Sequence, residues 1–255
     1  MTSKSNTEKL VLIFFTNLNF FVRKIAQATH RKELSLRWAD KREIFFDRNL
    51  ALNTAHSNDT SLIFERIIFS KLFLSPGGTV LELGFGDGLA GSLIYSNGQA
   101  SYVGIDNSPD ALKFAKRNYQ KPNVFFESGD ILEDFPSGNF TNVIWDGGIG
   151  FFSPSEQSKI LNSVARCLEN PVSNFHGVLS GFTISKGILT YQTYTNAPSS
   201  KSELHQILQK YFSNVVVVER LHEKDTYFYF AASNNVNSAL SPKLSFFPDT
   251  GIKNV

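Results

Sequence analysis

The spacing of apolar residues along the chain changes near residue 79. Before that point, apolar residues recur every three or four positions in segments 10–25, 37–50 and 61–74, which predicts helices. Beyond it, short apolar runs typical of buried strands alternate with amphipathic segments typical of helices. The predicted strands are residues 79–83, 101–105, 122–126, 141–146, 177–184, 213–219 and 226–232, and the predicted helices are residues 88–96, 109–119, 154–168 and 201–212.

The alternation of strands and helices determines the expected fold class. A helix that joins two neighbouring strands of a sheet makes them parallel, so this order predicts a mostly parallel, doubly wound sheet covered by helices on both faces. Only residues 219–225 separate the last two strands, too few for a helical connection, so we expect an antiparallel hairpin at the sheet edge. The expected protein is α/β, with a seven-stranded sheet, an N-terminal helical extension (1–75), a ligand-binding domain (76–232) and a peripheral tail (233–255).

Composition narrows the class of protein. Apolar residues make up 42% and charged residues 19% of the 255 residues, which excludes a disordered or collagen-like chain. The net charge is only +2, so we expect no nucleic-acid partner of the kind bound through a basic surface. The single cysteine, Cys167, lies in a predicted helix without a His or Asp spaced as a catalytic partner, and we expect it to be buried as a small apolar residue.

The apolar part of segment 10–25 has three interpretations. It is shorter than the roughly twenty residues that cross a bilayer, and its helical spacing predicts an amphipathic helix packed on the core. Seven basic and two acidic residues within 1–37 favour the alternative that this helix touches an anionic membrane surface. A cleaved signal peptide is the third, but Arg23 and Lys24 interrupt the stretch before the small residues at 26–28. We expect a cytoplasmic protein, with peripheral membrane contact as the alternative.

Three alternate glycines, Gly84, Gly86 and Gly88, stand directly after a predicted strand and before a predicted helix. Glycine permits a tight turn and a close approach of the backbone to a ligand, and the start of the helix offers unpaired N–H groups. The next strand is followed by Asp106, eighteen residues beyond Gly88, where a carboxylate can accept both hydroxyls of a ribose. A dinucleotide fingerprint would place its third glycine at Leu89, so a nicotinamide cofactor fits less well than another nucleoside ligand.

Glu82, two residues before the first glycine, adds an acidic position to this pattern. Residues 82–88 resemble the first motif of class I S-adenosylmethionine-dependent methyltransferases, which have a Rossmann-like fold. The resemblance covers about residues 78–232 and implies S-adenosyl-L-methionine as the cofactor, with Asp106 on the ribose and Asp130 on the adenine amino group. The residues that it implies in cofactor binding are Glu82, Gly84, Phe85, Gly86, Gly88, Asp106, Asn107, Gly129, Asp130, Ile131 and Asp146.

The candidate residues around the methyl acceptor follow the fourth and fifth predicted strands. Asp146 lies at the position where open sheets bind ligands and is the candidate general base, with capping of its loop as the alternative. Phe151, Tyr191 and Tyr194 are candidates for the acceptor pocket, and for the two tyrosines an ordinary surface loop is the alternative. Some small-molecule methyltransferases that the chain resembles have Glu and His where this chain has Gly150 and Phe151, which implies an apolar acceptor pocket.

The predicted function is transfer of a methyl group from S-adenosylmethionine to an oxygen or nitrogen of a small molecule, such as a sugar or another metabolite. Because Gly150 and Phe151 bring no polar side chain to the acceptor site, a catalytically silent cofactor-binding protein is the alternative, and a nicotinamide-dependent oxidoreductase is the third hypothesis. No Cys or His set has zinc-site spacing, so we expect no metal. Glu65 and Arg66, on the helix before the first strand, are expected to form a solvated ion pair, with closure of the pocket as the alternative.

Overall fold

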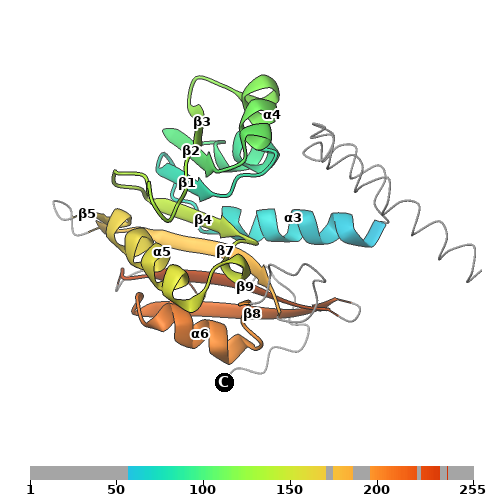
Figure 1. The fold of residues 1–255 in the computed structure, drawn as a ribbon, viewed down its shortest axis with the longest axis vertical. Coiled ribbons are helices and arrows are strands. Elements are labelled where there is room, and N and C mark those ends of the chain that lie inside the picture. The colour runs from blue at the N-terminus through green and yellow to red at the C-terminus, as the bar shows by residue number, and fades with distance from the viewer. Residues whose placement is uncertain (1–56, 171–174, 186–195, 223–224, 236–239, 241–255) are drawn as a thin grey trace, which may run out of the picture. The chain divides into compact units, whose positions relative to one another are not determined.

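The computed structural model describes residues 57–170, 175–185, 196–222, 225–235 and 240 (Figure 1). All of them belong to one compact unit, residues 48–255. The predicted helices at 10–25 and 37–50 lie outside the described residues, and the third predicted helix is α3 (Ser57–Leu72). Among the described residues, none of the helices combines the length and the apolar character that a membrane crossing requires.

A seven-stranded sheet forms the centre of the unit, with the strand order β3-β2-β1-β4-β7-β9-β8. Its strands are β1 (Thr79–Leu83), β2 (Ser101–Asp106), β3 (Val124–Ser128), β4 (Asn142–Asp146), β7 (Val178–Ile184), β8 (Asn214–His222) and β9 (Asp225–Ser233). Strands β1, β2, β3, β4 and β7 run parallel, whereas β9 is antiparallel to both β7 and β8. The predicted fold class, a mostly parallel seven-stranded sheet with a C-terminal antiparallel hairpin, is therefore confirmed.

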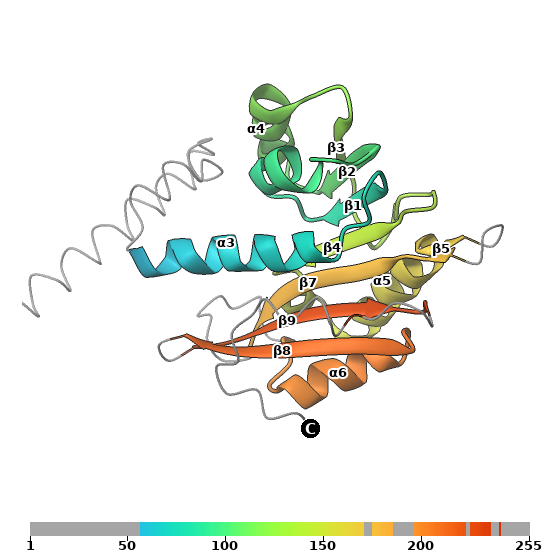
Figure 2. The same ribbon diagram turned by 180° about the vertical axis from the view of Figure 1, so that it is seen from behind.

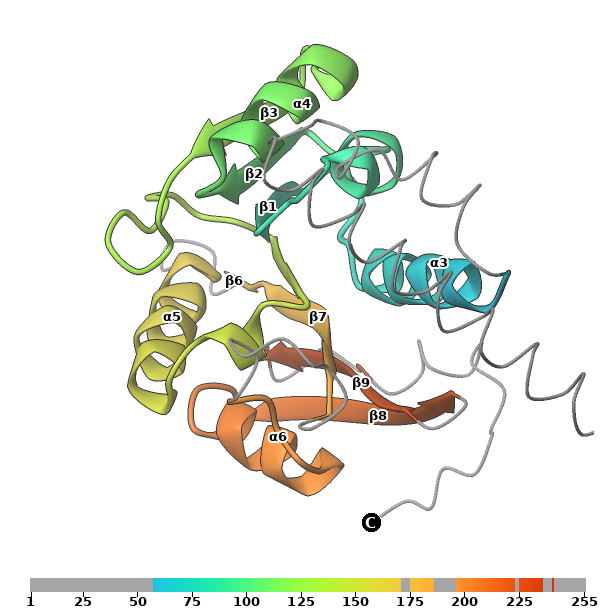
Figure 3. The same cartoon turned by 45° about the vertical axis from the view of Figure 1, so that its right-hand side comes forward.

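Helices cover both faces of the β7 and β9 region (Figures 2 and 3). The helical elements after α3 are the π-helical turn η2 (Gly91–Tyr95), α4 (Pro109–Tyr119), the 3₁₀ turn η3 (Ile149–Phe151), α5 (Pro154–Cys167) and α6 (Lys201–Gln209). Alternate side chains of a strand point to opposite faces. Accordingly, Leu179 of β7 packs in one core cluster with Leu161 of α5 and Leu204 of α6, whereas Phe182 packs in another with Phe69 of α3. This part of the sheet is thus buried between α3 on one face and α5 and α6 on the other.

Two local features depart from the predicted elements. Strands β5 (Glu169–Asn170) and β6 (Phe175–His176) form a separate antiparallel pair, which is too short to leave a periodic pattern in the sequence. The predicted helix after the glycine loop contains the π-helical turn η2, in which the Ser96 N–H donates to the Gly91 carbonyl at 2.9 Å. A Cβ at Gly91 would lie 2.1 Å from the Tyr102 hydroxyl oxygen, so glycine lets this turn approach β2 closely.

Cys167 is buried at the end of α5, as predicted, and its thiol lies 3.2 Å from the Val164 carbonyl oxygen. Burial raises the pKa of this thiol from 9.0 to about 12, so the reactive thiolate is about a thousandfold rarer at pH 8 than for an ordinary thiol. We therefore expect a thiol-specific disulfide reagent to label the native protein at least ~100-fold more slowly than the protein unfolded in guanidinium. Equal labelling rates in the two states would contradict this prediction.

Candidate functional site

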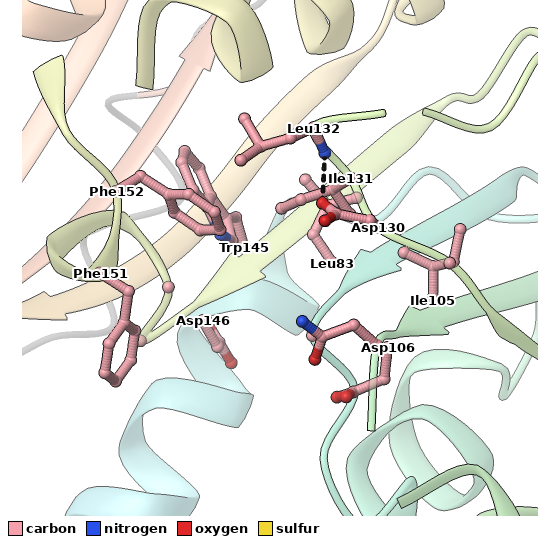
Figure 4. Close-up of a pocket in the computed structure, with 15 residues that line it drawn as sticks. Leu83, Ile105, Asp106, Asp130, Ile131, Leu132, Trp145, Asp146, Phe151 and Phe152 are labelled. Carbon is pink, nitrogen blue, oxygen red and sulfur yellow. Dashed lines mark hydrogen bonds between the residues drawn. The ribbon is translucent and has the colours of Figure 1, made fainter. Parts of the chain in front are cut away.

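A cavity of about 370 Å³ opens at the carboxyl ends of β1, β2 and β4, beside the segment that follows β3. This is where the strand order reverses, because β1 lies between β2 and β4 in the sheet, and such reversal points are where open α/β sheets bind ligands. Figure 4 shows three aromatic side chains on one side of the cavity and Asp106 on the other. The lining residues are Leu83, Gly84, Ile105, Asp106, Asn107, Gly129, Asp130, Ile131, Leu132, Trp145, Asp146, Gly147, Gly148, Phe151 and Phe152.

The three glycines of the loop after β1 divide into two structural roles. Gly84 and Gly86 have φ values of +73° and +59°, and a Cβ built on either would meet no atom within 4 Å. Their backbone therefore borders open space, which a ligand can approach. Gly88 has a φ of +76°, but its Cβ would lie 2.8 Å from the Ala115 Cβ and from the Phe126 ring. Gly88 thus lets the loop pack against α4 and β3. Of the three glycines, Gly84 alone is among the residues that line the cavity.

Asp106 connects the glycine loop to the end of β2. Its Oδ2 accepts the Gly86 N–H at 3.0 Å, and its Oδ1 accepts the Ser108 N–H at 2.9 Å. Burial raises the pKa of the Asp106 carboxyl, and these two backbone N–H groups partly oppose that shift. The sequence pattern assigned Asp106 to binding a ribose. The structure shows that its carboxylate also holds the glycine loop in place.

Two residues that the resemblance implied in cofactor binding lie beneath the loop rather than along the cavity. Glu82 is 3% exposed and accepts a hydrogen bond from the Tyr102 hydroxyl at 2.5 Å. Phe85 is 2% exposed, and its ring centroid lies 4.9 Å from that of Phe126. Burial and the negative charge of Glu82 raise the pKa of Tyr102, so its hydroxyl keeps the proton that it donates. Both side chains are buried on the protein side of the glycine loop and stabilise its conformation.

Gly129, Asp130 and Ile131 line the cavity next to the end of β3. The Asp130 side chain is exposed, and its Oδ1 accepts the Leu132 N–H at 2.8 Å, so Asp130 also shapes its own turn. A Cβ at Gly129 would lie 2.9 Å from the Ile105 Cδ1, so a larger residue there would require the end of the Ile105 side chain to shift. Asn107, which precedes the Ser108 cap of α4, is exposed at the same rim.

Asp146 ends β4 and lines the cavity. The Tyr95 hydroxyl donates a hydrogen bond to Asp146 Oδ2 at 3.1 Å. Tyr95 is completely buried, and this burial, followed by the negative charge of Asp146, raises its pKa, so the hydroxyl stays protonated and acts as a donor. Sequence reasoning missed Tyr95, because no spacing rule relates a residue of the π-helical turn to a strand end fifty-one positions later.

Aromatic side chains from β4 and from the segment that follows it form the opposite wall. The ring centroids of Trp145 and Phe152 lie 5.9 Å apart, and Phe151 lines the cavity with 49% of its surface exposed. A Cβ at Gly148 would lie 2.1 Å from the Trp145 Nε1, so glycine allows the loop to cover the indole. Of the predicted pocket aromatics, only Phe151 can be placed, because Tyr191 and Tyr194 lie outside the described residues.

Gln157 of α5 holds the loop after β4 in position. Its side chain is almost completely buried, and Nε2 lies within hydrogen-bond distance of the carbonyl oxygens of Ile149 (2.9 Å), Phe152 (3.0 Å) and Asn196 (3.0 Å). Helix α5 begins beside this loop with a capping box between Ser153 and Glu156. The loop that carries the aromatic wall is therefore anchored to the start of a well-capped helix.

Glu65 and Arg66 do not form the expected ion pair with each other. Glu65 Oε1 lies 3.3 Å from Arg220 Nε of β8, whereas the Arg66 guanidinium lies over the Phe182 ring, 5.7 Å from its centroid. The physical reason is that consecutive residues of a helix point in directions about 100° apart and do not face each other.

The charge of the lining favours a cationic ligand. Asp106, Asp130 and Asp146 contribute three carboxyl groups, and none of the fifteen described lining residues is Lys, Arg or His. Within the part of the chain that the structure describes, no three His, Cys, Asp or Glu side chains gather as a metal site would require. The cavity thus fits a nucleoside ligand that carries positive charge, such as the sulfonium of S-adenosylmethionine.

Comparison with known proteins agrees with this site. Residues 80–170, which include the glycine loop, Asp106, Asp130 and Asp146, match the family model described as a methyltransferase domain. Ribosomal protein L11 methyltransferase of Burkholderia thailandensis is 31% identical over 98 residues, which are 38% of this chain and 31% of that protein. The chain therefore matches about a third of the length of this relative.

Solved structures show the same fold at low sequence identity. N-methyltransferase NodS from Bradyrhizobium japonicum WM9 has a TM-score of 0.56 and 14% identity, over 69% of this chain and 98% of NodS. The same protein in complex with S-adenosyl-L-homocysteine has a TM-score of 0.54 and 13% identity, over 74% and 98% of the two chains. Residues 80–170 thus match a methyltransferase domain, and the strand order of the sheet is similar to that of solved methyltransferase structures.

Proposed function

We propose that this protein transfers the methyl group of S-adenosylmethionine to an oxygen or nitrogen of a small molecule. The observation that carries the proposal is the acidic cavity at the reversal point of the sheet, formed by the open glycine loop and the carboxylates at the ends of β2 and β4. When bound, S-adenosylmethionine supplies a methyl group on a positively charged sulfur. The surrounding carboxylates favour that charge in the ground state, and correct positioning of the acceptor supplies much of the rate.

Each part of the cavity binds a different part of the cofactor in this proposal. Asp106 accepts the ribose hydroxyls, because each of its oxygens takes one backbone N–H and keeps a further lone pair. Asp130 and Ile131 bind the adenine side. The open backbone at Gly84 and Gly86 faces the remaining part of the cofactor.

Asp146 is the proposed general base for a hydroxyl acceptor. A hydroxyl must lose its proton as its oxygen bonds to the methyl carbon, and the Asp146 carboxylate at the cavity wall can take that proton. The hydrogen bond from Tyr95 fixes the orientation of the carboxylate. A neutral amine already has a free lone pair, so for nitrogen Asp146 would remove the proton after transfer.

Calorimetric titration with S-adenosylhomocysteine tests the cofactor assignment, because this product binds without turning over. We expect a dissociation constant in the micromolar range, and no heat from NAD in a parallel titration. Well-folded protein that binds NAD instead would support the oxidoreductase alternative. Binding of S-adenosylhomocysteine without methyl transfer to any acceptor fraction would favour the catalytically silent alternative.

The size of the acceptor requires a separate test. The relative named above acts, by its name, on ribosomal protein L11, so a protein acceptor is the second candidate. Small-molecule transfer is supported by the aromatic wall of Trp145, Phe151 and Phe152, which lines the same cavity as Asp146 and offers apolar surface to a small acceptor. With radiolabelled S-adenosylmethionine, we expect label from a cell extract in acid-soluble products, whereas label in precipitated protein or in purified L11 would replace the small-molecule proposal.

A further inference from the structure

A second polar group lies on the α3 side of the sheet, outside the lining of the cavity. Arg66 of α3 and Tyr229 of β9 both pack on Phe182 of β7: the Arg66 guanidinium carbon is 5.7 Å and the Tyr229 ring centroid 5.4 Å from the Phe182 centroid. Phe69 covers Tyr229 from α3 at 5.3 Å, and Tyr227 stacks on Phe182 at 5.6 Å. One cation and one phenol therefore share an aromatic enclosure.

Both polar groups are hydrogen-bond donors that lack an acceptor among the described residues. Arg66 Nε and the Tyr229 hydroxyl are buried without a hydrogen-bond partner, and Tyr229 as a whole is 1% exposed. A guanidinium can only donate. Burial, followed by the charge of Glu65, raises the pKa of Tyr229 well above its usual range, so its hydroxyl keeps its proton and can donate as well.

Glu65, the neighbour of Arg66 on α3, does not supply the missing acceptor. Glu65 points to Arg220, at 3.3 Å. A buried donor without an acceptor is costly, so two of them beside one ring indicate that a ligand supplies the acceptor atoms. A ligand that accepts from both an Arg N–H and a phenol is anionic, and a carboxylate has the matching pair of oxygens.

This enclosure is close to the proposed reaction site. Phe182, on which Arg66 and Tyr229 pack, is the register partner of Asp146 in the parallel pair of β4 and β7. Asp146 in turn accepts the hydrogen bond of the Tyr95 hydroxyl. Arg66 as a whole is half-buried, whereas its Nε atom is buried.

We propose that Arg66 and Tyr229 bind the carboxylate of the methyl acceptor, which is therefore a small carboxylic acid whose nucleophilic oxygen or nitrogen is directed toward Asp146. This inference rests on the proposed methyltransferase function and specifies its acceptor. The Arg66 guanidinium lies over the Phe182 ring, on which Tyr227 stacks, and these aromatic surroundings favour an acceptor with an apolar or aromatic body.

The test follows the Arg66 Nε–H signal by nuclear magnetic resonance in ¹⁵N-labelled protein saturated with S-adenosylhomocysteine. The signal is assigned by its loss in Arg66→Gln. Three probes share one ring and differ in the head group: benzoate, benzamide and phenyl phosphate. We expect benzoate to shift the signal saturably, with a midpoint in the millimolar range, and benzamide to leave it in place. An equal response to benzamide, or tighter binding of phenyl phosphate, would overturn the carboxylate assignment.

Variants separate this site from the cofactor site. Arg66→Gln and Tyr229→Phe should each weaken benzoate binding, measured by calorimetry, about tenfold or more, while affinity for S-adenosylhomocysteine stays within about twofold. Tyr229→Phe removes one hydroxyl and keeps the ring, so it preserves the packing. Arg166→Gln, at an exposed position of α5, removes the same charge and should change neither affinity.

The outcomes distinguish the two proposals. Wild-type protein that binds S-adenosylhomocysteine but shows no Arg66 response to benzoate overturns the acceptor proposal alone. Variants that bind benzoate as well as the wild type does also overturn it. Loss of S-adenosylhomocysteine binding in the wild type is instead the failure of the proposed function, because that titration involves neither Arg66 nor benzoate.

Discussion

Replacing Asp106 by alanine should weaken the binding of S-adenosylhomocysteine about tenfold or more. The first reason is the loss of charge-assisted hydrogen bonds to the ribose hydroxyls. The second is local: the N–H groups of Gly86 and Ser108 lose their acceptor, so the glycine loop is no longer held in the binding conformation. Calorimetric titration of the folded variant measures the change, and circular dichroism verifies the fold.

A matched control comes from the same connection between β2 and α4. Asp110 lies in the first turn of α4 and does not line the cavity, so Asp110→Ala should leave the affinity for S-adenosylhomocysteine nearly unchanged. If Asp106→Ala folds and binds as tightly as this control does, Asp106 does not hold the ribose. The assignment of the strand-end acid would then be wrong.

The second large effect is on stability. Gly88→Ala should lower the free energy of unfolding by roughly 2–5 kcal/mol, from about 1–2 kcal/mol for an L-residue at positive φ and about 1–3 kcal/mol for overpacking. The overpacking arises because the new Cβ would lie 2.8 Å from the Ala115 Cβ and from the Phe126 ring, both in the core. Urea denaturation measures the loss as a lower midpoint at unchanged slope.

Gly98 provides the control for this substitution. Its φ of +78° is almost the same as that of Gly88, but a Cβ there would meet nothing within 4 Å. Gly98→Ala should therefore cost only the backbone part, about 1–2 kcal/mol. If both variants lose the same free energy of unfolding, Gly88 has no packing role. The glycine at this position would then have to be explained by contact with the ligand.

Several features of the fold could be predicted because they depend on neighbouring residues. The apolar runs and the short connection before Asp225 were enough to predict the parallel strands and the terminal hairpin, since pairing of adjacent segments follows from connection length. The pair β5 and β6 escaped prediction, because two residues per strand carry no period. The π-helical turn η2 also escaped prediction. Its Gly91 packs closely against Tyr102 of β2, and local sequence propensity does not report such a contact.

The residues of the candidate site also divide into those that the sequence could predict and those that it could not. Spacing brought Gly84, Asp106 and Asp146 to attention, because each lies at the end of a strand or directly after it, and parallel strands end at one edge. It could not separate Gly88 from the other two glycines, since only the position of Ala115 shows that the third one is a packing residue. Tyr95 was missed altogether, because its partner Asp146 is fifty-one residues away.

The sequence by itself predicted the seven strands of the main sheet, the helices between them and the acids at the strand ends, because these depend on short-range periodicity and spacing. The resemblance of a motif of a few residues indicated the cofactor. Only the tertiary structure decided which glycines face a ligand, that Tyr95 orients Asp146, and that Glu65 pairs with Arg220 while Arg66 lies on Phe182. The physical reason is that side-chain contacts depend on how distant elements pack. A helix such as α3 determines the direction of its own side chains, but the sheet against which it packs determines what they meet.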